Sequence, residues 1–164
     1  MSREPHLSRD RPGAAEALRL THSANERQSD KRQEIEAAVY SIARACGCEV
    51  LGFHWDKYPM SFHWAELKHG ERRFALVIHE SSPFVALSSA IPDYFNLSFI
   101  DDAAFTSAVQ QMSAPFLPLP AADLVRPLTD EDRAFVRTLS DQHGRDLEYW
   151  KPETVGDVIF NWWD

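Results

Sequence analysis

The chain has 164 residues, of which 44% are hydrophobic and 12% aromatic, and it carries a formal net charge of −8. This length favours one globular domain, because a chain of this size buries about 70% of its unfolded surface. The composition argues against a membrane protein, since no apolar run approaches the ~20 residues that a span requires. The first residues, MSREPHLSRDRPG, do not resemble a secretory signal, so we expect a cytoplasmic protein.

Charge is distributed unevenly along the chain. Residues 1–33 carry seven Lys and Arg against five Asp and Glu, a net charge of +2. Residues 34–164 carry ten against twenty, a net charge of −10. An acidic region of this kind is repelled by nucleic acid phosphates and by anionic membranes, so we expect neither as a partner. A protein with a basic surface would instead be attracted.

Residues 1–29 show no hydrophobic periodicity, which predicts a disordered arm with at most a transient helix over 14–20. Residues 30–164 form the predicted single domain. It begins with an amphipathic helix over 31–46, which Gly47 ends. Cys46 and Cys48 flank this glycine in a C-x-C arrangement with no second pair, so we expect reduced thiols rather than a zinc site.

A β-rich block follows this helix. Residues 48–55 are predicted to form a strand, and 60–68 with 71–80 a hairpin whose turn is His69-Gly70. This register pairs His63 with Leu76 and Glu66 with Arg73. One hairpin face is then core, and the other is apolar enough to be covered by a further element. Two short strands, 84–88 and 96–100, complete the sheet.

The pattern becomes helical after Asp101. One helix begins at Asp101 or Asp102, and the proline-rich residues 114–127 are predicted to form an ordered loop. A second helix begins at Thr129 and ends at Gly144, and a third begins at Thr154. The sequence therefore predicts an α+β fold. A single domain holds an antiparallel sheet of four to five strands, with an N-terminal helix and three C-terminal helices packed on it.

The segment YWKPETVGDVIFNWWD, residues 149–164, holds three of the five tryptophans. Aromatic side chains supply the buried surface that offsets the entropy lost on ordering a chain. We therefore expect this segment to dock on the domain.

His54 and Asp56, with His63 and His79, are the candidates for binding zinc or iron, because imidazoles and carboxylates ligate both metals. The predicted register, however, places His63 and His79 on opposite faces. No H-E-x-x-H, G-x-S-x-G or G-x-G-x-x-G motif occurs. We therefore predict no catalytic residue, no metal site and no cofactor. A small metal-dependent enzyme using these histidines is an alternative.

Residues 53–64, FHWDKYPMSFHW, contain more aromatic side chains than one sheet face needs. Trp and Tyr are common anchors of protein interfaces. We therefore predict a partner-binding surface formed by Trp55, Asp56, Tyr58, Phe62 and Trp64.

In overall character, residues 30–164 resemble the immunity proteins of bacterial toxin systems, which are small, acidic, single-domain α+β proteins without catalytic motifs. No motif specifies a particular family. The resemblance implies a non-catalytic protein that masks a partner toxin, with acidic residues steering it to a basic cleft and Trp or Tyr anchors holding it. An adaptor subunit of a larger complex is the second alternative.

Overall fold

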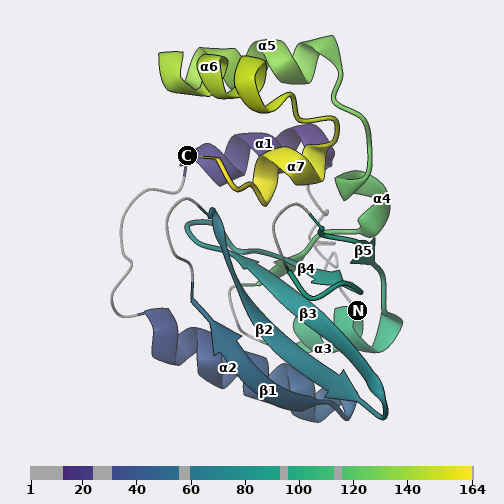
Figure 1. Cartoon of the computed structure of the whole chain (residues 1–164). Helices are drawn as coiled ribbons and strands as arrows, with labels where there is room; N and C mark the ends of the chain where they lie inside the picture. The colour runs from purple at the N-terminus through teal and green to yellow at the C-terminus, as the bar shows by residue number, and fades with distance from the viewer. Residues whose placement is uncertain (1–12, 24–30, 56–59, 93–95, 113–115, 164) are drawn as a thin grey trace, which may run out of the picture.

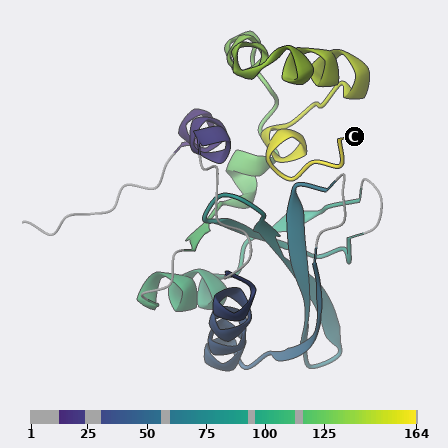
Figure 2. The same ribbon diagram turned by 90° about the vertical axis from the view of Figure 1, so that its left-hand side faces the viewer.

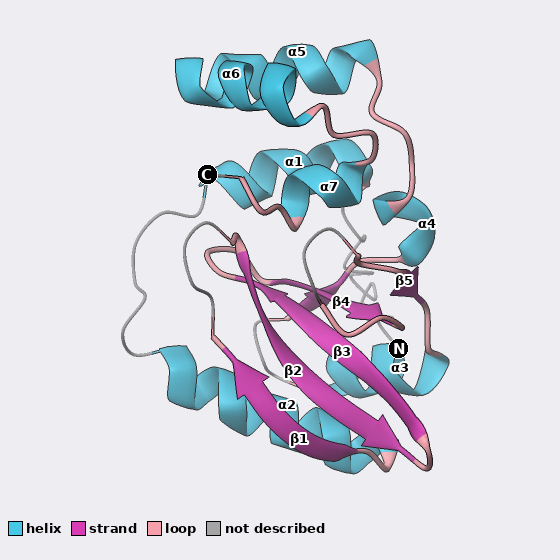
Figure 3. Cartoon of the chain, in the orientation of Figure 1, coloured by secondary structure: helices cyan, strands magenta, loops and turns pink. Residues whose placement is uncertain are grey.

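The computed structural model of the chain describes residues 13–23, 31–55, 60–92, 96–112 and 116–163 (Figure 1). Within these residues, helices and a mixed sheet form one α+β domain, so the predicted fold class is confirmed (Figure 3). No helix in the described part of the chain is both long and apolar enough to cross a bilayer.

The sheet has six strands, of which five follow one another in chain order across the sheet. Each of these five is antiparallel to its neighbours: β1 (Glu49–His54), β2 (Phe62–His69), β3 (Arg72–His79), β4 (Phe84–Ser88) and β5 (Phe99–Ile100). The sixth strand, β6 (Leu117–Pro118), runs parallel to β4 and lies in the segment predicted as a loop. Strand β1 pairs only with β2 among the described strands, so it forms one edge of the sheet.

The β2–β3 hairpin turns at Gly70 and Glu71, so the predicted turn at His69-Gly70 is wrong. Gly70 has a φ of +61°, and a two-residue hairpin turn commonly requires such a left-handed residue at its first position. The register is therefore displaced by two residues, and His63 pairs with Ile78 instead of Leu76. A shift of two residues leaves every side chain on its predicted face, because strand side chains alternate with period two.

The helices cover both faces of the sheet (Figure 2). One face packs against α2 (Lys31–Cys46) and α3 (Ala103–Gln111). The other face packs against α1 (Ala14–Ser23), α4 (Ala121–Leu124) and α7 (Val155–Ile159). The hairpin of α5 (Asp130–Leu139) and α6 (Asp141–Trp150) forms an outer layer over α1 and α7 (Figure 1). The second apolar hairpin face is thus covered, as predicted.

Helix α1 lies inside the predicted N-terminal arm. Ala17 and Leu18 are almost fully buried, and the helix contacts α7 and α5. The sequence indicated only a transient helix because α1 is short, and its packing partners lie more than a hundred residues later. Residues 1–12 and 24–30 of the predicted arm lie outside the described residues.

The helix predicted from Thr129 to Gly144 is two helices. Ser140 separates them: its backbone is extended, and its hydroxyl accepts a hydrogen bond from the His143 backbone N–H. Gly144 therefore lies within α6 and does not end a helix. The predicted capping at Thr129 is confirmed, because Thr129 and Asp132 exchange backbone and side-chain hydrogen bonds of 2.9 and 3.1 Å.

The C-terminal segment docks on the sheet as predicted. The backbone N–H of Ser61 donates to the carbonyl of Asn161 at 3.0 Å, and the N–H of Asn161 donates to Ser61 Oγ at 2.8 Å. Phe160 is buried and its ring packs against that of Phe62. These contacts join the start of β2 to the residues that follow α7.

Candidate functional site

The structure places the five predicted binding residues in different environments. Trp55 is half-buried, whereas Phe62 is fully buried and Trp64 keeps only 9% of its surface exposed. Asp56 and Tyr58 lie outside the described residues. Within the described chain, Trp55 is therefore the member of the set with substantial accessible surface.

Strand alternation explains the burial of Phe62 and Trp64. Both side chains point to the sheet face that α7 covers. The Phe62 ring meets that of Trp162 edge to face at 5.3 Å, and Trp64 stacks on His54 with ring centroids 3.7 Å apart. These contacts hold the fold together, so Phe62 and Trp64 are core residues of the α7 face.

Trp55 belongs to a continuous row of rings across strand β1. Tyr40 of α2 meets Phe53 at a centroid distance of 5.7 Å, and Phe53 stacks with Trp55 at 5.8 Å. Trp55 meets His63 of β2 at 5.1 Å, and the guanidinium of Arg32 lies 4.9 Å from a Trp55 ring centroid. We call these five residues the β1 aromatic row.

The β1 aromatic row is open to solvent. Tyr40 is 51% exposed, Arg32 is exposed, and the other members are half-buried. The row also lies at the sheet edge, where the outer backbone groups of β1 have no neighbouring strand among the described residues. Aromatic side chains with one face packed and one face wet are suited to anchoring a protein partner.

Tyr40 was absent from the predicted set, although the sequence carries a signal for it. The buried stripe of α2 includes Ala38, Val39 and Ile42. Tyr40 falls outside that stripe, and an aromatic residue on the polar face of a helix is a candidate for an interface.

The histidines of the predicted alternative site do not converge. His54 and His63 lie on opposite faces of the sheet, against Trp64 and Trp55 respectively. His79 is buried, and its Nδ1 accepts hydrogen bonds from the backbone N–H groups of Ser81 and Ser82 at 3.2 and 3.1 Å. Across the described residues, no three His, Cys, Asp or Glu side chains are arranged to hold a metal ion.

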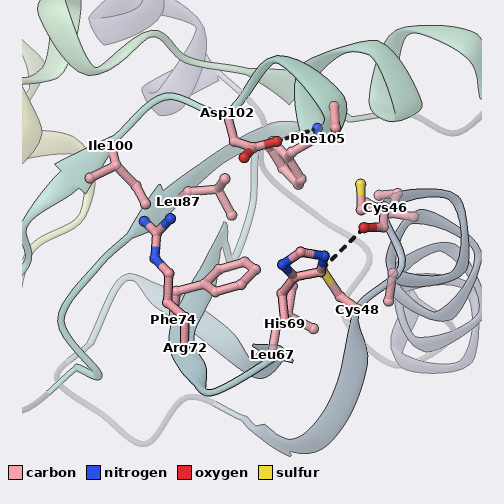
Figure 4. A pocket seen from close by; sticks show the side chains of 13 residues that line it. Cys46, Cys48, Leu67, His69, Arg72, Phe74, Leu87, Ile100, Asp102 and Phe105 are labelled. Atoms are coloured by element: carbon pink, nitrogen blue, oxygen red, sulfur yellow. Dashed lines mark hydrogen bonds between the residues drawn. The ribbon is translucent and has the colours of Figure 1, made fainter.

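A cavity of about 150 Å³ lies between the C-terminal end of α2 and the start of α3 (Figure 4). Its walls are mostly aliphatic and aromatic side chains from both helices and the sheet. The polar lining residues are Cys46, Cys48, His69, Arg72 and Asp102. The sequence singled out the two thiols but not the other polar lining residues. The β2–β3 turn brings His69 to the cavity, and Asp102 lies there because it caps the start of α3.

Both thiols in this cavity are held in their protonated form. Burial raises the pKa of Cys46 and of Cys48 above the ordinary thiol value, and the charge of Asp102 adds to the effect on both. The Cys48 thiol donates to the carbonyl of Cys46 at 3.8 Å. Activated cysteine nucleophiles have lowered pKa values, so this environment disfavours nucleophilic catalysis. Both cysteines are free, as predicted.

Comparison of the chain with protein-family models, with curated proteins and with solved structures found no match.

Proposed function

We propose that this chain is a non-catalytic protein-binding domain of the immunity type, which masks a toxin or effector that has a basic surface. The β1 aromatic row carries the proposal, because it combines accessible Trp and Tyr side chains with an edge strand. Interfaces draw most of their binding free energy from a few such anchors.

The charge of the domain supports a basic partner. Residues 34–164 carry a net charge of −10, which accelerates association with a cationic protein and weakens contact with phosphate backbones. We therefore expect it to bind a protein rather than nucleic acid or a membrane, and we propose the cytoplasm as its compartment.

The test combines capture from the native host with matched variants. The wild-type protein should retain one stoichiometric basic partner and inhibit that partner's toxic activity. The variants Tyr40→Ala and Trp55→Ala should weaken binding by about 2 kcal/mol each, or roughly 30-fold. Val125→Thr alters a side chain that is 54% exposed outside the row, and it should leave the affinity unchanged.

Three results would contradict the proposal. Unchanged binding of Tyr40→Ala and Trp55→Ala would show that the β1 aromatic row is not part of the interface. A bound partner that keeps its full activity would identify an adaptor subunit. A purified protein that carries stoichiometric zinc or iron and captures no partner would favour the metal-dependent enzyme.

A further inference from the structure

A groove lined by three tryptophans lies where the C-terminal segment passes the end of α6. Its volume is about 230 Å³. Trp150, Trp162 and Trp163 line it, together with Phe99 and Glu153. All three tryptophans are half-buried, so each keeps accessible surface within a packed setting. We call this feature the tryptophan groove.

The walls of the tryptophan groove are fixed by packing. Trp162 packs edge to face on the buried Phe62 ring at 5.3 Å. The backbone N–H of Trp163 donates to Asn161 Oδ1 at 3.3 Å, and the backbone N–H of Asn161 donates a hydrogen bond to Ser61 Oγ. A preformed site loses little conformational entropy when it binds a ligand, so such walls favour recognition.

The charged side chains that line the groove are Glu153, Asp157 and Lys151, a net charge of −1, and all three are exposed. The Asp157 carboxylate accepts hydrogen bonds from the backbone N–H groups of Glu153 and Thr154 at 3.0 and 2.9 Å, whereas Glu153 presents its carboxylate at the groove. Aromatic rings attract cations through their negative faces, and neighbouring carboxylates add a Coulombic attraction. This combination suits a cationic side chain.

We propose that the tryptophan groove binds an arginine side chain presented by the protein partner. The identity of the occupant rests on the proposed function, which supplies a partner with a basic surface. A guanidinium fits better than an ammonium, because it is planar, stacks on aromatic faces and is more weakly hydrated. The tryptophan rings would contact the guanidinium plane, and Glu153 would accept its N–H groups.

The probe is a blocked Gly-Arg-Gly peptide, titrated into isotopically labelled protein while the indole N–H signals of the tryptophans are recorded. We expect saturable shifts for Trp150, Trp162 and Trp163 with a Kd on the order of 1 mM. The matched peptide with neutral citrulline in place of arginine should produce no saturable shift. The arginine affinity should fall as salt is added, because the attraction is Coulombic.

Three charge variants test the electrostatic contribution to binding. Glu153→Gln should weaken binding of the arginine peptide about threefold to tenfold, as expected for loss of a charged hydrogen bond. Glu71→Gln changes the net charge equally at an exposed position in the β2–β3 turn, and it should leave the Kd unchanged. Lys151→Gln removes the cation that lines the groove and should strengthen binding.

Several outcomes would overturn the inference. Equal binding of the citrulline peptide would show that the groove selects shape and not charge. An unchanged Kd for Glu153→Gln would show that the Glu153 carboxylate does not contribute to binding. If the peptide fails to bind while a partner is captured through the β1 aromatic row, the groove assignment fails and the proposed function stands. If the peptide binds but no partner is captured, the proposed function fails instead.

Discussion

The same substitution, glycine to alanine, should have opposite effects at two helical positions. Gly156 lies in α7, and an added Cβ would lie 2.6 Å from Phe99 Cε2 and 2.9 Å from the Leu124 carbonyl oxygen. Gly144 lies in α6, where the nearest atom to an added Cβ is Arg137 Cγ at 3.9 Å. The first site has no room for a methyl group, and the second has enough.

The magnitudes follow from two competing effects. Alanine is favoured over glycine in a helix by about 0.5–1 kcal/mol, which applies at both sites. Overpacking costs about 1–3 kcal/mol, and at Gly156 one of the opposing atoms belongs to the backbone, which cannot rotate away. We therefore expect Gly156→Ala to destabilise the protein by about 1–2 kcal/mol. Gly144→Ala should stabilise it by about 0.5–1 kcal/mol.

Urea denaturation gives the free energy of unfolding of both variants and thermal melts give their Tm, each followed by tryptophan fluorescence and far-ultraviolet circular dichroism. For a domain of this size, 1 kcal/mol shifts the Tm by about 2–4 °C. Gly156→Ala should lower the Tm by about 5 °C, and Gly144→Ala should raise it by about 2 °C. If Gly156→Ala fails to destabilise the protein, then α7 is not packed against Phe99 and Leu124 as described, and if Gly144→Ala destabilises it, the site at Gly144 has no room for a methyl group.

Three further outcomes are expected. Lys151 is left-handed with a φ of +49°, so Lys151→Gly should raise the free energy of unfolding by about 0.5 kcal/mol in urea titrations, because glycine adopts this conformation without the side-chain penalty. Burial opposes ionisation of Asp132, but hydrogen bonds from Arg126 and Thr129 prevail and lower its pKa. The ionised carboxylate therefore adds to the free energy of unfolding at neutral pH, and this stabilisation is lost as the pH falls. Asp132→Asn should therefore be less stable than wild type at pH 7, with the difference narrowing below about pH 4 in thermal melts. Cys46 and Cys48 should react with iodoacetamide more slowly in the native protein than in urea, since their raised pKa values keep the thiols protonated.

The sequence was sufficient where local signals and packing agree. The period of α2, the faces of the β2–β3 hairpin and the two capping boxes all arise from neighbouring residues, and each was predicted. Strand β6 was missed because a two-residue strand in a proline-rich segment has no periodicity. The break at Ser140 was missed because a serine within a helical pattern is common, whereas Gly144 is the stronger signal for a helix end.

The candidate site was harder to predict than the fold. Trp55 was identified from the aromatic density of residues 53–64, but its neighbours Tyr40 and Arg32 come from another element. Composition could not separate Trp55 from Phe62, since Phe62 is buried by α7, which lies far later in the chain. The tryptophan groove could not be predicted either, because it forms only when the residues after α6 pack back on the sheet, and tertiary contacts alone determine that packing.

The hydrogen-bonded pairing of Ser61 with Asn161 has a consequence for biosynthesis. The two residues are 100 positions apart, so β2 leaves the ribosome long before its C-terminal cover exists. At synthesis rates of about 5–20 residues per second, the interval is about 5–20 s. During that time the side chains of Phe62 and Val77, buried in the finished domain, lack α7 and Phe160. These apolar side chains therefore stay uncovered while the chain is being made, and the native fold forms only after residue 161 has been added.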